Sequence, residues 1–129
     1  MYGNQPLFIT HFPKAIKFFN MRENDERSEI VNSTDLILPG SGEAVGAAER
    51  EYRYEKLKER LENSPMMKNL IKRGGSIEDF DWYLDCVKSN GIRVHSGCGI
   101  GLNRVTQFVL GTNDIRASTT FPLNSETIM

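Results

Sequence analysis

Apolar and polar residues are arranged in short runs along the first part of the chain, and at helical spacing further on. Strands are expected over 7–12, 16–21 and 34–38, where aromatic and β-branched residues cluster. A fourth strand, made of small residues, is expected over 43–48. This order, followed by helical segments, predicts an α+β fold with a mainly antiparallel sheet.

Two helices are predicted in the middle of the chain. The first spans 49–63 and places Leu57 and Leu61 on its core-facing side beneath charged residues. Residues 64–75 are interpreted as a loop with at most one helical turn, which a double glycine ends. A second helix is predicted over 76–90, because the sequence Ser-Ile-Glu-Asp at residues 76–79 is typical of a capped helix start.

A glycine-rich segment, HSGCGIGLNR over residues 95–104, is the strongest candidate for a binding site. Glycines in a strand let a ligand lie against the backbone. Arg104 then adds a fixed positive charge at the start of a helix predicted to end at Leu110. The pattern fits a flat anionic ligand, and it also fits an ordinary turn before a core helix with a solvent-facing arginine.

Composition limits the classes of function. The 129 residues correspond to one domain of ordinary hydrophobicity, and no apolar run approaches the roughly 20 residues that cross a membrane. Because 16 basic residues face 17 acidic ones, the net charge of −1 gives no general attraction to nucleic acid. Cys86 and Cys98 lack the spacing of a zinc site and are expected to be reduced. A cytoplasmic protein without membrane contact is expected.

The segment HSGCGIGLNR resembles the third signature of class II aminoacyl-tRNA synthetases. In order, residues 7–122 resemble the carboxyl-terminal half of the catalytic domain in the aspartyl and asparaginyl group. Phe12-Pro13 matches the start of this region, and the long turn 39–42 is closer to the asparaginyl branch. The resemblance implies an α+β fold with helices flanking the sheet, and it assigns residues 1–129 to this portion of the catalytic domain.

The resemblance also implies a set of site residues. Asp35 and Glu43 would bind the Mg²⁺ that bridges the phosphates of ATP, while Gly46 and Arg50 would contact the amino acid. Arg104 would be the catalytic residue and would contact the nucleotide. The nucleotide-binding set also includes the following residues: Glu43, Gly99, Gly101, Leu102 and Asn103. In the family, Gly99 and Gly101 give the arginine its space.

For the asparaginyl branch, the resemblance implies ATP-dependent activation of asparagine and its transfer to tRNA by a homodimer. The first two class II signatures and the anticodon-binding domain are not found in these 129 residues. The chain is therefore expected to be inactive on its own.

Two other functions stay open. One is a synthetase paralogue that makes free asparagine from aspartyl-adenylate without tRNA. The other is a non-catalytic module that binds a nucleotide or a partner. The second is supported by Asn20, Glu49 and Asn103, which depart from the family's usual tyrosine, glutamine and acidic residue. Glu49 is expected to bring a carboxylate close to the amino-acid site.

Overall fold

The computed structural model describes residues 4–91 and 93–122, which divide into two compact units. The sheet unit comprises residues 4–10, 34–47 and 98–122. The helical unit comprises residues 11–33, 48–91 and 93–97. Segments of the two units therefore alternate along the chain.

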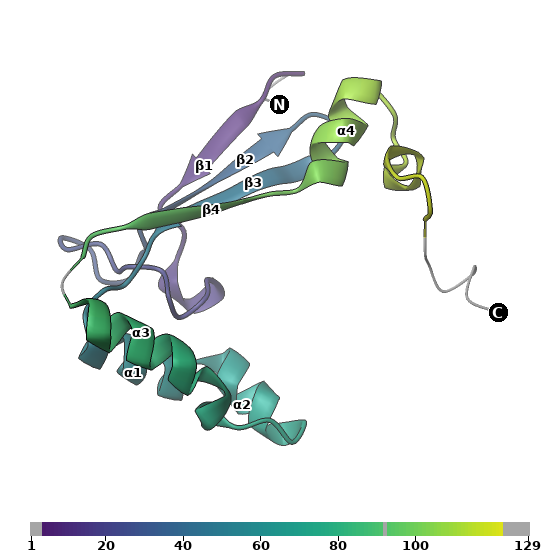
Figure 1. Cartoon of the computed structure of the whole chain (residues 1–129). Helices are drawn as coiled ribbons and strands as arrows, with labels where there is room; N and C mark the ends of the chain where they lie inside the picture. Colours follow the sequence, from purple (N-terminus) through teal and green to yellow (C-terminus); the bar gives the residue numbers. More distant parts are fainter. Residues whose placement is uncertain (1–3, 92, 123–129) are drawn as a thin grey trace. The chain divides into compact units, whose positions relative to one another are not determined.

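The strands form one sheet in the order β1-β2-β3-β4 (Figure 1). They are β1 (Leu7–Thr10), β2 (Ser33–Leu38), β3 (Gly42–Glu49) and β4 (Ser96–Ile100). β1 pairs antiparallel with β2, and Leu7 lies opposite Ile37. A tight turn joins β2 to β3, and in this turn the Ser41 N–H donates to the Leu38 carbonyl at 3.2 Å. The predicted α+β fold with an antiparallel sheet is confirmed.

The expected first strand is shorter than the sequence suggested. β1 ends at Thr10 because His11 adopts the left-handed conformation, with φ of 59°, and turns the chain before Pro13. The expected strands over 34–38 and 43–48 are confirmed, each extended by one residue at its start and the second also at its end.

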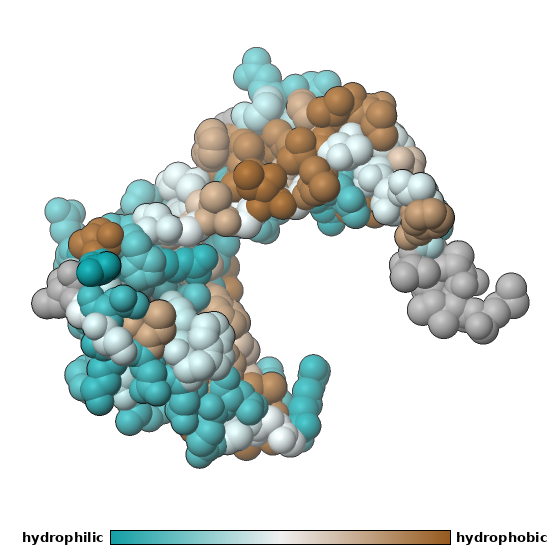
Figure 2. Space-filling view, in the orientation of Figure 1, coloured by the Kyte–Doolittle hydropathy of each residue, from teal (hydrophilic) through white to brown (hydrophobic). Residues whose placement is uncertain are grey.

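The helix predicted from Arg104 to Leu110 is confirmed as α4 (Leu102–Leu110), two residues longer. Gln107 is its buried residue, and the amide of Gln107 donates to the Gly40 carbonyl at 3.2 Å. Four apolar residues of α4 are exposed, namely Leu102, Phe108, Val109 and Leu110, and Figure 2 shows hydrophobic colour over this helix. A short 3₁₀ helix, η3 (Ile115–Ser118), follows.

The helical unit contains most of the buried apolar residues. Its helices are α1 (Tyr54–Asn63), α2 (Pro65–Lys72) and α3 (Asp81–Asn90), with the 3₁₀ helices η1 (Lys14–Ile16) and η2 (Ile77–Phe80). α1 packs against both α2 and α3 (Figure 1). The core between them consists of Phe19, Leu57, Leu61, Met67, Leu84 and Val87. The predicted inward side of α1 is thus confirmed.

The strand expected over 16–21 is wrong. Ile16 ends η1, and Met21 takes part only in an isolated bridge to Arg50. This segment is irregular because it packs through Phe19, which is 4% exposed. In addition, the guanidinium of Arg60 on α1 donates to backbone carbonyls of the segment. Apolar residues that pack into the helical core produce the same local sequence pattern as a strand.

The first helix begins at Tyr54, five residues later than predicted. Glu49 is still part of β3, and the next residues form the connection. The backbone N–H of Arg53 donates to the carboxylate of Glu51 at 3.1 Å, and the Leu57 N–H makes its helical bond to the Arg53 carbonyl. Strand pairing therefore overrides the helix propensity of Glu49.

The loop expected over 64–75 is also wrong, because α2 occupies most of it. Ser64 caps α2 by accepting the Met67 N–H at 3.0 Å, and Pro65 occupies the first helical position, where its missing N–H costs nothing. Burial of Met67, which is 1% exposed, anchors the helix to the core.

The second predicted helix is confirmed by η2 and α3. Ser76 and Asp79 cap it reciprocally, and the Ser76 N–H donates to the carboxylate of Asp79 at 3.0 Å. Residue 92, expected to lead into the glycine-rich strand, and residues 123–129 of the predicted tail lie outside the described residues. Among the described residues, none of the helices has both the length and the apolar character needed to cross a membrane.

Candidate functional site

Two carboxylates gather beside Gly46 in the sheet unit. Asp35 on β2 is 5% exposed, and Glu43 lies near the start of β3. A Cβ atom built on Gly46 would lie 2.9 Å from Glu43 Oε1 and 3.6 Å from Asp35 Oδ1. The two oxygens are therefore no further apart than the sum of these distances. A side chain at position 46 would compete with the carboxylates for this space.

This donor set fits a hard cation such as Mg²⁺. Mg²⁺ prefers oxygen ligands, and in nucleotide sites it is usually bound by one or two carboxylates together with phosphates and water. Among the described residues, no group of three or more histidine, cysteine or acidic side chains is placed to bind a metal alone. Asp35 and Glu43 would thus be partial ligands, and the remaining positions would belong to substrate and solvent.

Arg104 lies in the first turn of α4 and reaches back to the β2–β3 turn. Its Nη1 donates to the Ser41 carbonyl at 2.8 Å, two residues before Glu43 in the chain. No carboxylate pairs with Arg104 in the part of the chain that the structure describes. Because a guanidinium carries five N–H donors, Arg104 keeps donors for an anion.

The glycines at and after β4 have different surroundings. A Cβ on Gly101 would lie 3.3 Å from Cγ of Arg104, which folds back over this glycine. A Cβ on Gly99 would meet no atom within 4 Å, so the structure gives no contact between Gly99 and Arg104. Leu102 is 74% exposed, and Asn103 is exposed next to it at the start of α4.

Arg50 belongs to the helical unit, where a glycine that the sequence analysis missed makes room for it. A Cβ on Gly97 would lie 3.0 Å from Nη2 and 3.1 Å from Nε of Arg50. The backbone N–H of Arg50 donates to the His95 carbonyl at 2.9 Å, which fixes the strand pairing. Alternation of glycines at 97, 99 and 101 was the available signal, but only the structure shows that Gly97 lies against Arg50 and Gly101 against Arg104.

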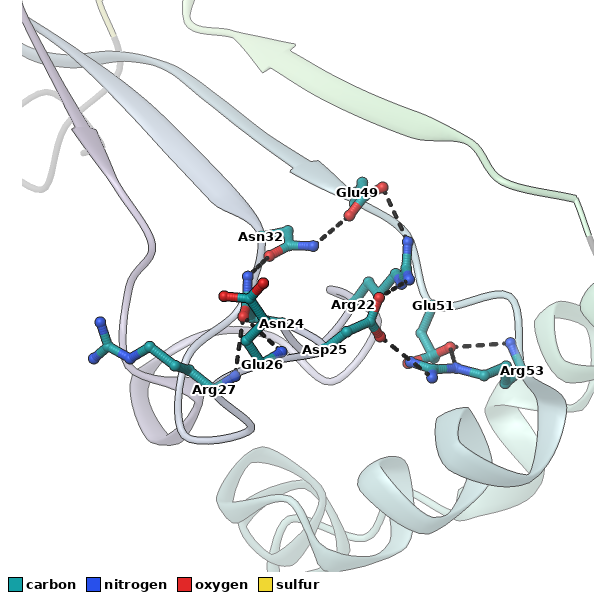
Figure 3. A network of polar contacts seen from close by, with 9 residues as sticks. All are labelled: Arg22, Asn24, Asp25, Glu26, Arg27, Asn32, Glu49, Glu51 and Arg53. Atoms are coloured by element: carbon teal, nitrogen blue, oxygen red, sulfur yellow. Dashed lines mark hydrogen bonds and ion pairs between the residues drawn. The ribbon is translucent and has the colours of Figure 1, made fainter.

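Glu49, next to Arg50, has its carboxylate fully engaged by neighbours in the helical unit (Figure 3). Arg22 Nη1 donates to one carboxylate oxygen at 3.2 Å, and Asn32 Nδ2 donates to the other at 2.5 Å. Arg22 also pairs with Asp25 at 2.5 Å. The carboxylate that was expected close to the amino-acid site is thus held by two donors, Arg22 and Asn32.

Glu51 and Arg53 form a second ion pair of the helical unit (Figure 3). The side chain of Glu51 is fully buried, and Arg53 donates to both of its oxygens at 2.7 and 2.8 Å. Burial alone would raise the pKa of Glu51, but the hydrogen bonds from the Arg53 side chain and backbone outweigh it, so the pKa lies below its usual value. Glu51 is thus ionised and paired at neutral pH.

One hollow of the helical unit measures about 520 Å³, and Lys14, Glu23 and Arg60 are among its lining residues. None of the residues expected to bind ATP, Mg²⁺ or an amino acid lines it. This hollow therefore has no part in the predicted site.

Comparison with known proteins shows the family of this chain. The model for class II tRNA synthetases (D, K and N) matches residues 1–125. The chain belongs to this family. Among class II synthetases, it is 40% identical to the asparagine--tRNA ligase of Ureaplasma urealyticum over 121 residues, which make up 94% of this chain and 24% of that protein.

Solved class II synthetases share the fold. The asparaginyl-tRNA synthetase of Pyrococcus horikoshii is 33% identical, with a TM-score of 0.78 over 95% of this chain and 27% of its own. The enzyme of Entamoeba histolytica, solved in complex with asparaginyl-adenylate, is 29% identical, with a TM-score of 0.80 over 95% of this chain and 26% of its own. This chain spans about a quarter of the length of these class II relatives.

Proposed function

We propose that this chain supplies part of the catalytic site of an asparagine--tRNA ligase. That site would activate asparagine with ATP and transfer it to tRNA. The placement of Asp35 and Glu43 beside Gly46 carries the proposal, because two converging carboxylates fit an Mg²⁺-nucleotide. Relatives named asparagine--tRNA ligase and an asparaginyl-adenylate complex of one such enzyme support the choice of substrate.

In this reaction the carboxylate of asparagine attacks the α-phosphorus of ATP, and pyrophosphate leaves. When bound, Mg²⁺ would neutralise charge on the phosphates. Arg104 would donate hydrogen bonds to the nucleotide, with Gly101 leaving room for it, and the exposed Leu102 and Asn103 would border the nucleotide. Positioning and charge stabilisation account for most catalysis of this kind.

The amino acid would be bound by Arg50, whose planar guanidinium suits a carboxylate or a carboxamide oxygen. Gly46 would leave the floor of the pocket free of a side chain. A cytoplasmic location and assembly of the whole enzyme as a homodimer belong to the same proposal.

Nucleotide binding by the chain itself is the first test. We expect calorimetric titration to show that Mg²⁺ strengthens ATP binding, and that this dependence is lost when Asp35→Asn and Glu43→Gln are combined. Glu29→Gln removes an exposed carboxylate of the other unit and is the matched control. Equal Mg²⁺ dependence in all three proteins would contradict the proposed metal ligands.

A chimera tests the reaction. This chain would replace the matching segment of the Ureaplasma urealyticum ligase, and asparagine-dependent exchange of pyrophosphate into ATP would be measured. We expect exchange, and its loss in Arg104→Gln. If aspartate and ammonia instead give free asparagine without tRNA, the paralogue function replaces the proposal. If a folded chimera binds ATP but forms no adenylate, a non-catalytic module replaces it.

A further inference from the structure

Three residues of the helical unit form a closed ring of backbone hydrogen bonds. The Arg22 N–H donates to the Glu49 carbonyl, the Glu49 N–H donates to the Asn32 carbonyl, and the Asn32 N–H donates to the Arg22 carbonyl. Each bond measures 2.9 Å. The ring fixes the end of β3 at the residue just before Arg50.

The side chains of the same three residues repeat this connection. Arg22 and Asn32 each donate to a different oxygen of the Glu49 carboxylate, at 3.2 and 2.5 Å (Figure 3). Asn24 in turn donates to Oδ1 of Asn32 at 2.9 Å, which fixes the orientation of the Asn32 amide. Since both partners of Glu49 are donors, position 49 needs two acceptors at the same time.

A carboxylate meets this requirement, and a carboxamide does not. Glutamine has one acceptor oxygen and one NH₂ group, so it would turn a donor toward either Arg22 or Asn32. Rotation of the Asn32 amide would relieve the conflict only by breaking its bond from Asn24. The negative charge also strengthens the hydrogen bond from the arginine.

Successive side chains of a strand point to opposite faces. Glu49 is held on its own side by Arg22 and Asn32, while the guanidinium of Arg50 lies against Gly97. Among the described residues, no carboxylate pairs with Arg50. Holding Glu49 in this way leaves Arg50 free to bind a ligand and keeps its backbone fixed.

We propose that Glu49 is a positioning residue, which Arg22 and Asn32 hold so that Arg50 stays over Gly97 in the orientation that receives the amino acid. This inference rests on the proposed function, since it takes the amino acid as the ligand of Arg50. Position 49 thereby acts on amino-acid binding through Arg50, without touching the substrate.

Nuclear magnetic resonance of the full chain tests the positioning directly. In Glu49→Gln we expect the Arg50 Nε–H vector to lose its fixed orientation, so that its order parameter falls from about 0.8 to below about 0.6. The double variant Glu49→Gln with Asn32→Asp restores one acceptor for each donor, and we expect the high order parameter to return. Glu29→Gln, which breaks an exposed pair, should leave it unchanged.

Chimera kinetics supply the functional measurement. In Glu49→Gln we expect the KM for asparagine to rise about tenfold while the KM for ATP stays constant, and the Asn32→Asp partner to reverse the change. A merely structural role would shift both KM values and the folded fraction together, and would overturn the inference. An unchanged order parameter of the Arg50 Nε–H in Glu49→Gln would also overturn it.

The two proposals fail in different ways. If the parent chimera shows no asparagine-dependent exchange of pyrophosphate, the proposed function fails, and the resonance of Arg50 still decides whether Glu49 positions it. If the parent chimera is active and Glu49→Gln alters neither Arg50 nor the KM for asparagine, only the positioning role fails.

Discussion

The helical unit and the sheet unit differ in how they bury apolar residues. In the helical unit, α1, α2 and α3 enclose a continuous core that includes Leu57, Leu61 and Met67, each at most 1% exposed. In the described part of the sheet unit, the buried apolar residues are Leu38 and Ala44, whereas α4 leaves Val109 75% exposed. Most of the proposed site residues thus lie in the unit with little core of its own.

The comparison teaches that chemistry and folding stability are divided between the units. Hydrophobic burial provides most of the stabilisation of a fold, so the helical unit holds the larger share. Elements with few buried contacts open more easily. Substitutions of similar chemistry should therefore have unequal effects in the two units.

The largest difference is expected for core truncation. Leu57→Ala should lower the free energy of unfolding by about 3 kcal/mol, because it removes buried methyl groups and leaves a cavity. Val109→Ala in the sheet unit should change it by less than about 0.5 kcal/mol. Urea unfolding followed by circular dichroism measures both. Equal losses at the two positions would end the comparison.

Removal of the buried carboxylate of Glu51 should come next. Glu51→Gln should cost about 2 kcal/mol at neutral pH, because Arg53 loses its buried charged partner. The cost is limited because Arg53 is 30% exposed and keeps Asp25 at 3.8 Å. Because the pKa of Glu51 is lowered from 4.5 in the folded state, its contribution is present above that value and is lost as the pH falls through the folded pKa. The difference between parent and variant should therefore shrink in acid. A constant difference down to pH 2 would contradict this.

Self-association should distinguish the exposed surfaces. The exposed apolar residues of α4 adjoin one another, including Phe108, Val109 and Leu110, and such patches promote association. Val109→Lys should shift sedimentation velocity profiles toward the monomer. The matched control is Ile71→Lys in the helical unit, where Ile71 is 56% exposed. An equal effect of both changes would show that the α4 patch has no special part.

The smallest effects are expected for exposed ion pairs. Arg27 and Glu29 pair at 2.9 Å in the helical unit, and Asp114 and Arg116 pair at 2.8 Å in the sheet unit. Solvent and salt screen such pairs. Glu29→Gln and Asp114→Asn should each leave the unfolding midpoint unchanged within error. A clear shift in only one variant would reveal a difference between the units that burial does not explain.

Local sequence signals predicted several elements because their causes are local. The small-residue strand β3, the Ser76 cap and the helix after the glycines all follow from nearby residues. The segment 16–21 was wrongly predicted as a strand, because its apolar Phe19 packs into a core formed by helices that are distant in sequence. The start of α1 was misplaced because backbone hydrogen bonds with Arg22 and Asn32 keep Glu49 in β3.

By itself, the sequence predicted the α+β class from its apolar periodicity and singled out Arg104 after a glycine-rich segment, because residue types and short spacings record backbone freedom and charge. Its resemblance to class II synthetases added Asp35, Glu43 and Arg50 as candidates. Only the tertiary structure decided that Gly97 makes room for Arg50 and that Arg22 and Asn32 hold Glu49. Those relations join residues far apart in sequence through strand pairing, and the orientation of a side chain depends on neighbours that no local pattern contains.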